Sequence, residues 1–113
     1  MLINNEVIEH IYDENSVENE IIEALRDNRV EVFYQPIYNT KTHKFTSAEA
    51  LVRIRSREGN IIPPGRFIAV AEKRGLILRL GERVFEIVCR FIVQHDIHAM
   101  GIEYIECNLS VVQ

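Results

Sequence analysis

The pattern of apolar and polar positions divides the chain into alternating helices and strands. Apolar residues recur at helical spacing in three segments, which we expect to be helices: residues 17–28, 65–74 and 78–95. β-branched and aromatic residues fill three other segments, which we expect to be strands: residues 31–38, 45–54 and 103–109. Because only a short polar connector separates the first two strands, they are expected to pair antiparallel. Strands that alternate with helices are typical of α/β folds.

The first fifteen residues form a polar leader in front of these elements. Apolar residues at helical spacing within residues 1–15 predict an interdomain linker or a lead-in helix. Ser16 is a candidate N-cap for the helix that follows, because Glu18 and Glu20 would lie in its first turn. We therefore expect the folded domain to comprise residues 16–113.

The strand predicted over residues 45–54 has one apolar face and one face that carries chemical groups. Side chains alternate along a strand, so Glu49, Leu51 and Arg53 share one face. Along that face the carboxylate, the apolar spacer and the guanidinium follow one another at intervals of about 7 Å, which suits a metal ion beside an anionic group. The alternative is that Glu49 and Arg53 belong to a structural ion-pair network.

Four sequence blocks in a fixed order decide between these readings. They are Tyr34-Gln35-Pro36-Ile37, Ala48-Glu49-Ala50-Leu51-Val52-Arg53, Pro64-Gly65-Arg66-Phe67-Ile68 continuing to Ala71-Glu72 and Gly75-Leu76-Ile77, and Asn108-Leu109-Ser110. Together they resemble the EAL domain family, which is named for the Glu-Ala-Leu triplet. The resemblance implies a phosphodiesterase that linearises the bacterial second messenger cyclic dimeric GMP in a modified (β/α)8 barrel with an antiparallel first strand. Many members have Trp where this chain has Ile54.

The resemblance also implies roles for individual residues. Glu49 and Asn108 would be ligands of Mg2+ or Mn2+, and carboxylate and amide oxygens suit these cations. Gln35, Leu51 and Arg53 would bind the substrate, with Arg53 holding a phosphate. Because metal–oxygen bonds are only about 2.0–2.6 Å long, we expect the Glu49 and Asn108 oxygens to lie within about 8 Å of each other.

Glu106 departs from the family pattern, which has small residues at this position. It lies two residues before Asn108 and therefore on the same face of the last predicted strand. Three interpretations remain open for Glu106: it joins the metal site, it pairs with a basic residue later in the chain, or it marks an altered site.

The length of the chain limits what this polypeptide can do. A (β/α)8 barrel takes roughly 250 residues, whereas the chain has 113. We therefore expect an α/β fold that is an incomplete (β/α)8 TIM-like barrel, the N-terminal part of an EAL domain. The family's further acidic metal ligands and its lysine lie downstream, so the chain alone is expected to lack activity.

The intact domain would hydrolyse cyclic di-GMP to linear pGpG by two-metal activation of water. The alternative is a catalytically inert EAL domain that acts as a cyclic di-GMP receptor or a protein-interaction module.

Composition limits which binding partners and which cellular compartment are expected for this chain. The hydrophobic fraction of 47% is that of an ordinary folded domain, and the net charge of −4 argues against binding of a nucleic-acid polymer. No signal peptide or long apolar run is present, so we expect no membrane contact. Cys89 and Cys107 lack zinc-site spacing and are expected to be core thiols in a reducing cytoplasm. The four histidines lie in polar stretches and are expected at the surface.

We predict that the chain self-associates. An open piece of barrel exposes the edge of its last strand and the inner face of its sheet, and both favour association in water. Light scattering over a range of concentrations should therefore report a mass above that of the monomer. A compact monomer that stays soluble at high concentration would contradict this prediction.

Overall fold

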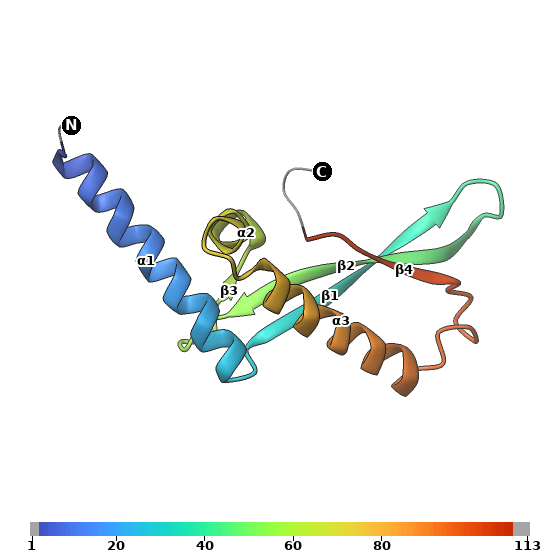
Figure 1. The fold of residues 1–113 in the computed structure, drawn as a ribbon. Coiled ribbons are helices and arrows are strands. Elements are labelled where there is room, and N and C mark those ends of the chain that lie inside the picture. Colours follow the sequence, from blue (N-terminus) through green and yellow to red (C-terminus); the bar gives the residue numbers. More distant parts are fainter. Residues whose placement is uncertain (1–2, 110–113) are drawn as a thin grey trace.

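The structure is a computed structural model that describes residues 3–109. In chain order the elements are α1 (Asn5–Arg26), β1 (Val30–Asn39), β2 (Lys44–Arg55), β3 (Ile61–Ile62), α2 (Pro64–Lys73), α3 (Ile77–Gln94) and β4 (Tyr104–Cys107). The fold is therefore mixed α/β, and every predicted helix and strand is present, with ends that shift by a few residues except at the start of α1 (Figure 1). The short strand β3 was not predicted, because two residues are too few to show an alternating pattern.

Strand β2 organises the sheet. It pairs antiparallel with β1 along nearly its whole length, as predicted, and parallel with β4. Its C-terminal end also pairs antiparallel with β3. Strands β2 and β4 run in the same direction, and α2 and α3 lie between them in the chain. This connection is that of a βαβ unit.

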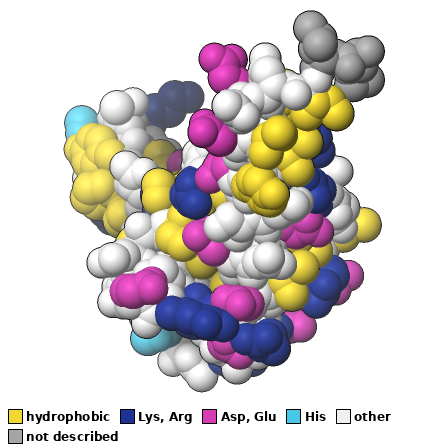
Figure 2. All heavy atoms as spheres, turned by 90° about the vertical axis from the view of Figure 1, so that its left-hand side faces the viewer, with side chains coloured by type: hydrophobic (Ala, Val, Ile, Leu, Met, Phe, Trp, Pro, Cys, Tyr) yellow, Lys and Arg dark blue, Asp and Glu magenta, His cyan; other side chains and the backbone are white. Residues whose placement is uncertain are grey.

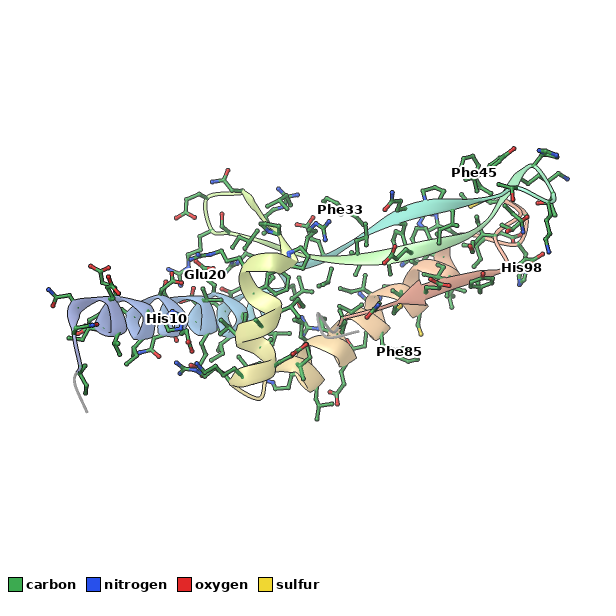
Figure 3. All side chains as sticks on the ribbon, turned by 90° about the horizontal axis from the view of Figure 1, so that it is seen from above. His10, Glu20, Phe33, Phe45, Phe85 and His98 are labelled. Carbon is green, nitrogen blue, oxygen red and sulfur yellow. The ribbon has the colours of Figure 1, made fainter. Side chains whose placement is uncertain are left out.

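The core lies between one face of β2 and the helices. Alternate residues of β2 are buried: Ala48, Ala50, Val52 and Ile54. The helices contribute three sets of buried side chains to the same cluster: Val17, Ile21, Ala24 and Leu25 from α1, Phe67, Ile68 and Ala71 from α2, and Leu80, Val84 and Val88 from α3. The opposite face of the sheet carries Glu49, Leu51 and Arg53. Figure 3 shows α2 and α3 lying on one side of the β1–β2 pair, with Phe33 on the other side.

The leader does not end before the domain but continues into it, which corrects one expectation. Helix α1 begins at Asn5, and the Asn4 Oδ1 caps it by accepting a hydrogen bond from the Val7 N–H at 3.0 Å. Ser16 is therefore an interior residue of α1 and not an N-cap. The reason is that residues 5–15 contain no Pro or Gly and that the middle of α1 packs on α2. The proposed domain boundary at residue 16 stays a prediction.

Ion pairs connect α1 to the end of α2. The carboxylate of Glu14 is 6% exposed and accepts hydrogen bonds from Lys73 Nζ at 2.7 Å and from Arg74 Nη2 at 3.3 Å. Arg74 also donates to Glu18 at 2.8 Å. The hydrogen bond from Lys73 holds the pKa of Glu14 below its ordinary value. On the side of the molecule that carries α1, acidic and basic side chains lie next to one another (Figure 2).

Exposure confirms some expectations and corrects others. All four histidines are exposed, as predicted. Cys107 is exposed and Cys89 is only partly buried, so neither is a core thiol. The reason for Cys107 is that, within residues 3–109, β4 pairs only with β2 and its other edge is uncovered. Ile92 is 40% exposed near the end of α3, although its helical spacing from the buried Val84 and Val88 would place it on the inner face. Among the described residues, no helix is long and apolar enough to span a membrane.

Neighbouring isoleucines on α1 test whether this helix is part of the core. Ile21 is completely buried, whereas Ile22 is 37% exposed. We expect Ile21→Val to lower the free energy of unfolding by about 0.5–1.5 kcal/mol, because it removes a buried methyl group. The matched control Ile22→Val should change it by less than about 0.5 kcal/mol. Urea unfolding followed by circular dichroism measures both. Equal effects would show that α1 does not pack as described.

The stability of the chain should depend on pH through Glu14. Because the pKa of Glu14 is lowered by folding, its charge stabilises the fold above its ordinary pKa of 4.5, and this contribution is lost as the pH falls through the lowered value. Glu14→Gln should therefore lower the urea midpoint at neutral pH, and this penalty should disappear once the pH has fallen below the lowered pKa of Glu14, where both side chains are neutral. Glu9→Gln, an exposed position on the same helix, is the control. A penalty for Glu14→Gln that is independent of pH would refute this account.

Candidate functional site

The face of β2 opposite the core carries the residues predicted to be functional. Glu49, Leu51 and Arg53 are half-buried and alternate with fully buried neighbours. The predicted shared face of Glu49 and Arg53 is therefore confirmed. The alternation arises because the strand pleat turns successive side chains to opposite sides, and the helices occupy only one of those sides.

Strand register brings two further polar residues beside Glu49. Gln35 of β1 is the partner of Glu49 on one side, and Glu106 of β4 is its partner on the other. Side chains of directly opposed residues lie on the same face, with their Cβ atoms roughly 4.5–5.5 Å apart. We call these three residues the carboxylate row. The row crosses the sheet with two acidic groups in direct succession.

Asn108 directly follows the end of β4, and the burial of its neighbours indicates the face toward which it points. Ile105 and Leu109 both pack against the hydrophobic core. Leu109 also lies close to α3, because a Cβ atom placed on Gly81 would approach Leu109 Cδ1 to 3.2 Å. Because Ile105 and Leu109 point toward the helices, alternation turns Glu106 and Asn108 toward the face of Glu49. The distance between the Glu49 and Asn108 oxygens stays a prediction.

Within residues 3–109, Arg53 contacts a backbone carbonyl and an aromatic ring but no carboxylate. Its Nη1 donates to the Val52 carbonyl at 2.7 Å, and its Cζ lies 6.0 Å from the centroid of the Phe33 ring. Its partner across the strands is Glu31, but Glu31 binds Arg55 instead, with Arg55 Nε at 2.5 Å from its carboxylate. The guanidinium of Arg53 therefore keeps donors available for an anion.

The ion-pair alternative for Glu49 and Arg53 is not supported by these contacts. Within residues 3–109, no ion pair includes Glu49, Glu106 or Arg53. The ion pairs that do form connect α1 to α2 and the loops, join β1 to β2 through Arg55, or lie within one helix. The polar groups of this face are thus not used to hold the described fold together.

The donor atoms on this face are hard oxygens. Two carboxylates and one amide come from Glu49, Glu106 and Asn108, which is chemistry suited to Mg2+ or Mn2+ and poorly suited to softer metals. Among the described residues, no group of three or more His, Cys, Asp and Glu side chains gathers at one place. A complete metal centre would therefore need donors beyond these residues.

Sequence reasoning missed two features of this face. Phe33 contacts Arg53, and its position two residues before Gln35 on the same strand was a usable signal, because such residues share a face. The direct juxtaposition of Glu106 with Glu49 had no signal in the sequence. It depends on the register between strands that are more than fifty residues apart in the chain.

Comparisons with known sequences show which proteins this chain is similar to. The sequence model of the family described as "EAL domain" matches residues 18–113. The chain is 37% identical over 90 residues to the cyclic di-GMP phosphodiesterase NbdA of Pseudomonas aeruginosa, covering 80% of this chain and 11% of NbdA. It is 41% identical over 68 residues to the signaling protein YkoW of Bacillus subtilis, covering 60% of this chain and 8% of YkoW. The chain thus spans about a tenth of the length of these relatives.

Solved structures resemble the fold. The PaMucR phosphodiesterase in complex with c-di-GMP superposes with a TM-score of 0.71 at 32% identity, covering 84% of this chain and 38% of that one. The FimX EAL domain from Pseudomonas aeruginosa bound to c-di-GMP gives a TM-score of 0.68 at 19% identity, covering 81% and 36%. The second likeness concerns the fold alone. In both cases the described elements correspond to part of a larger domain.

Proposed function

Because the chain belongs to the EAL domain family, we propose that it is the N-terminal portion of a cyclic di-GMP phosphodiesterase domain. The four strands and the helices between and around them would be the first part of a (β/α)8 barrel with an antiparallel first strand. The intact domain would hydrolyse one phosphodiester of cyclic di-GMP to give linear pGpG, in the bacterial cytoplasm. The observation that carries this proposal is a set of polar groups without ion-pair partners, Gln35, Glu49 and Arg53, on the face of the sheet that none of the described helices covers.

The donor set fits the cations that the family resemblance implies. Glu49 and Asn108 would hold Mg2+ or Mn2+ through a carboxylate and an amide oxygen, because hard cations prefer oxygen ligands. When bound, such ions lower the pKa of a coordinated water and neutralise charge on a phosphodiester. The residues of this chain provide only part of the coordination shell, so tight binding would need the acidic groups of later strands.

Three side chains would bind the dinucleotide. Arg53 would hold a phosphate, because its guanidinium has no carboxylate partner among residues 3–109 and lies at the carboxyl end of β2. Gln35 would donate to or accept from the ligand beside Glu49. Leu51 would pack against the ligand together with Phe33, which is its direct neighbour on β1 and is 43% exposed. An apolar strip next to a cation suits a nucleotide, which has a flat base and an anionic phosphate.

A receptor is the second candidate function, and Glu106 is the observation that favours it. Glu106 adds a negative charge next to Glu49, where the family pattern has a small residue. A site altered in this way could bind cyclic di-GMP or a protein partner without turnover, because a fold does not by itself determine an activity.

Turnover by the full-length protein tests the proposal. With Mg2+ or Mn2+ present, we expect conversion of cyclic di-GMP to pGpG, measured by chromatography of the nucleotides. Glu49→Ala should lower kcat/KM by more than about tenfold, because it removes a metal ligand. Arg53→Ala should raise KM by about 10–100-fold, the magnitude expected for a lost hydrogen bond to a charged phosphate. The control is Glu58→Ala, an exposed loop residue, which should leave both constants unchanged.

The possible outcomes separate the candidates. Binding of cyclic di-GMP without turnover would identify a receptor, and neither binding nor turnover would refute both functions. For the 113-residue chain by itself we expect no phosphodiesterase activity. Metal-dependent formation of linear dinucleotide by the purified chain would contradict that expectation.

A further inference from the structure

We propose that Glu106 is a third oxygen donor to the divalent cation held by Glu49, and that it raises the affinity of this chain for that cation. The inference rests on the cation of the proposed function, but it concerns a residue to which neither the family resemblance nor the comparisons assign a role. It decides between the three interpretations of Glu106 that the sequence left open.

The first argument is geometric. Glu49 and Glu106 are directly paired residues of the parallel strands β2 and β4. The pairing on either side of them is regular, from Ser47 with Tyr104 to Ala50 with Cys107, so their relation does not depend on a bulge or a loop. Because neighbouring strands lie about 4.7–4.9 Å apart, the two side chains leave the same face of the sheet side by side. Two carboxylates at this separation can coordinate a single ion.

The second argument is electrostatic. Like charges that face each other across a strand pair destabilise a sheet. Within residues 3–109, neither carboxylate has an ion-pair partner, and the row ends at Gln35, which is uncharged. The two arginines of β2 nearest to the row do not balance these charges, since Arg53 forms no ion pair within residues 3–109 and Arg55 binds Glu31. The described structure thus brings two negative charges together without a positive charge to balance them.

A divalent cation resolves this repulsion with the chemistry that is present. Glu106 adds a second anionic oxygen ligand to the charge of Glu49, while Asn108 contributes only a neutral amide. Because Mg2+ and Mn2+ give up hydration water only to strong oxygen ligands, the extra carboxylate has a large effect on affinity. A basic residue from later in the chain would also neutralise Glu106. The response to Mn2+ distinguishes such an ion pair from metal coordination.

Mn2+ binding to the full-length protein, which supplies the remaining donors, gives the first measurement. Electron paramagnetic resonance reports free Mn2+ in a titration, so no enzymatic activity is needed. Glu49→Gln and Glu106→Gln should each weaken binding by about tenfold or more, the effect expected when a metal site loses a supporting carboxylate. Glu103→Gln removes the same charge from an exposed position just before β4 and should leave the affinity unchanged. Failure to bind Mn2+, or equal affinity of Glu106→Gln and the unsubstituted chain, would overturn the proposal.

Thermal unfolding gives a second measurement with a distinctive sign. Without metal, Glu106→Gln should raise the melting temperature by about 1–5 °C, because it removes the repulsion. With saturating Mn2+ the order should reverse, because the unsubstituted chain gains more from the ion. If Glu106→Gln lowers the melting temperature without metal, a positive charge already holds Glu106 and the proposal is wrong.

The result is independent of the test of the proposed function. Mn2+ binding that requires Glu49 and Glu106, in a full-length protein that does not hydrolyse cyclic di-GMP, would support the role of Glu106 and refute the phosphodiesterase. Hydrolysis of cyclic di-GMP by a protein whose Mn2+ affinity is unchanged by Glu106→Gln would support the phosphodiesterase and refute the role of Glu106.

Discussion

The pairing of β2 with β1 on one edge and with β4 on the other is the constraint on which the rest of the structure depends. This register fixes which residues face the helices, because a shift of one residue would turn every side chain of β2 to the other side. Ala50, Val52 and Ile54 would then be exposed and Glu49 and Arg53 buried without partners. Burial of the apolar face therefore determines the position of the polar one.

Charged side chains differ in their partners between the contact of α1 with α2 and the open face of the sheet. Where α1 meets α2, acidic and basic side chains are paired, and Glu14 is nearly buried between Lys73 and Arg74. On the open face of the sheet, Glu49, Glu106 and Arg53 have no ion-pair partner among residues 3–109. Charges that bind each other contribute to folding, whereas charges left unpaired remain available for a cation or a phosphate. The second arrangement reduces stability and is typical of a binding site.

Family membership and geometry support each other at this site. The family resemblance points to Glu49, Arg53, Gln35 and Asn108 by position in the sequence. The structure places the first three on one face of the sheet, and Asn108 directly follows the end of β4. Glu106 shows the value of the geometric step, since the sequence left three interpretations of this residue open and its pairing with Glu49 favours one of them. Phe33 is a similar case, because its contact with Arg53 depends on the antiparallel register of β1.

The sequence by itself determined the order of the elements, the alternation of β2 and the shared face of Glu49, Leu51 and Arg53, because these follow from local periodicity. It did not determine that α1 is one helix, since Ser16 has the features of a cap and only packing on α2 shows that the helix continues through it. It also could not place Glu106 beside Glu49, or show that Cys107 is exposed. These facts depend on which strands pair, in which register, and on what covers their edges, and such contacts join residues that are distant in the chain.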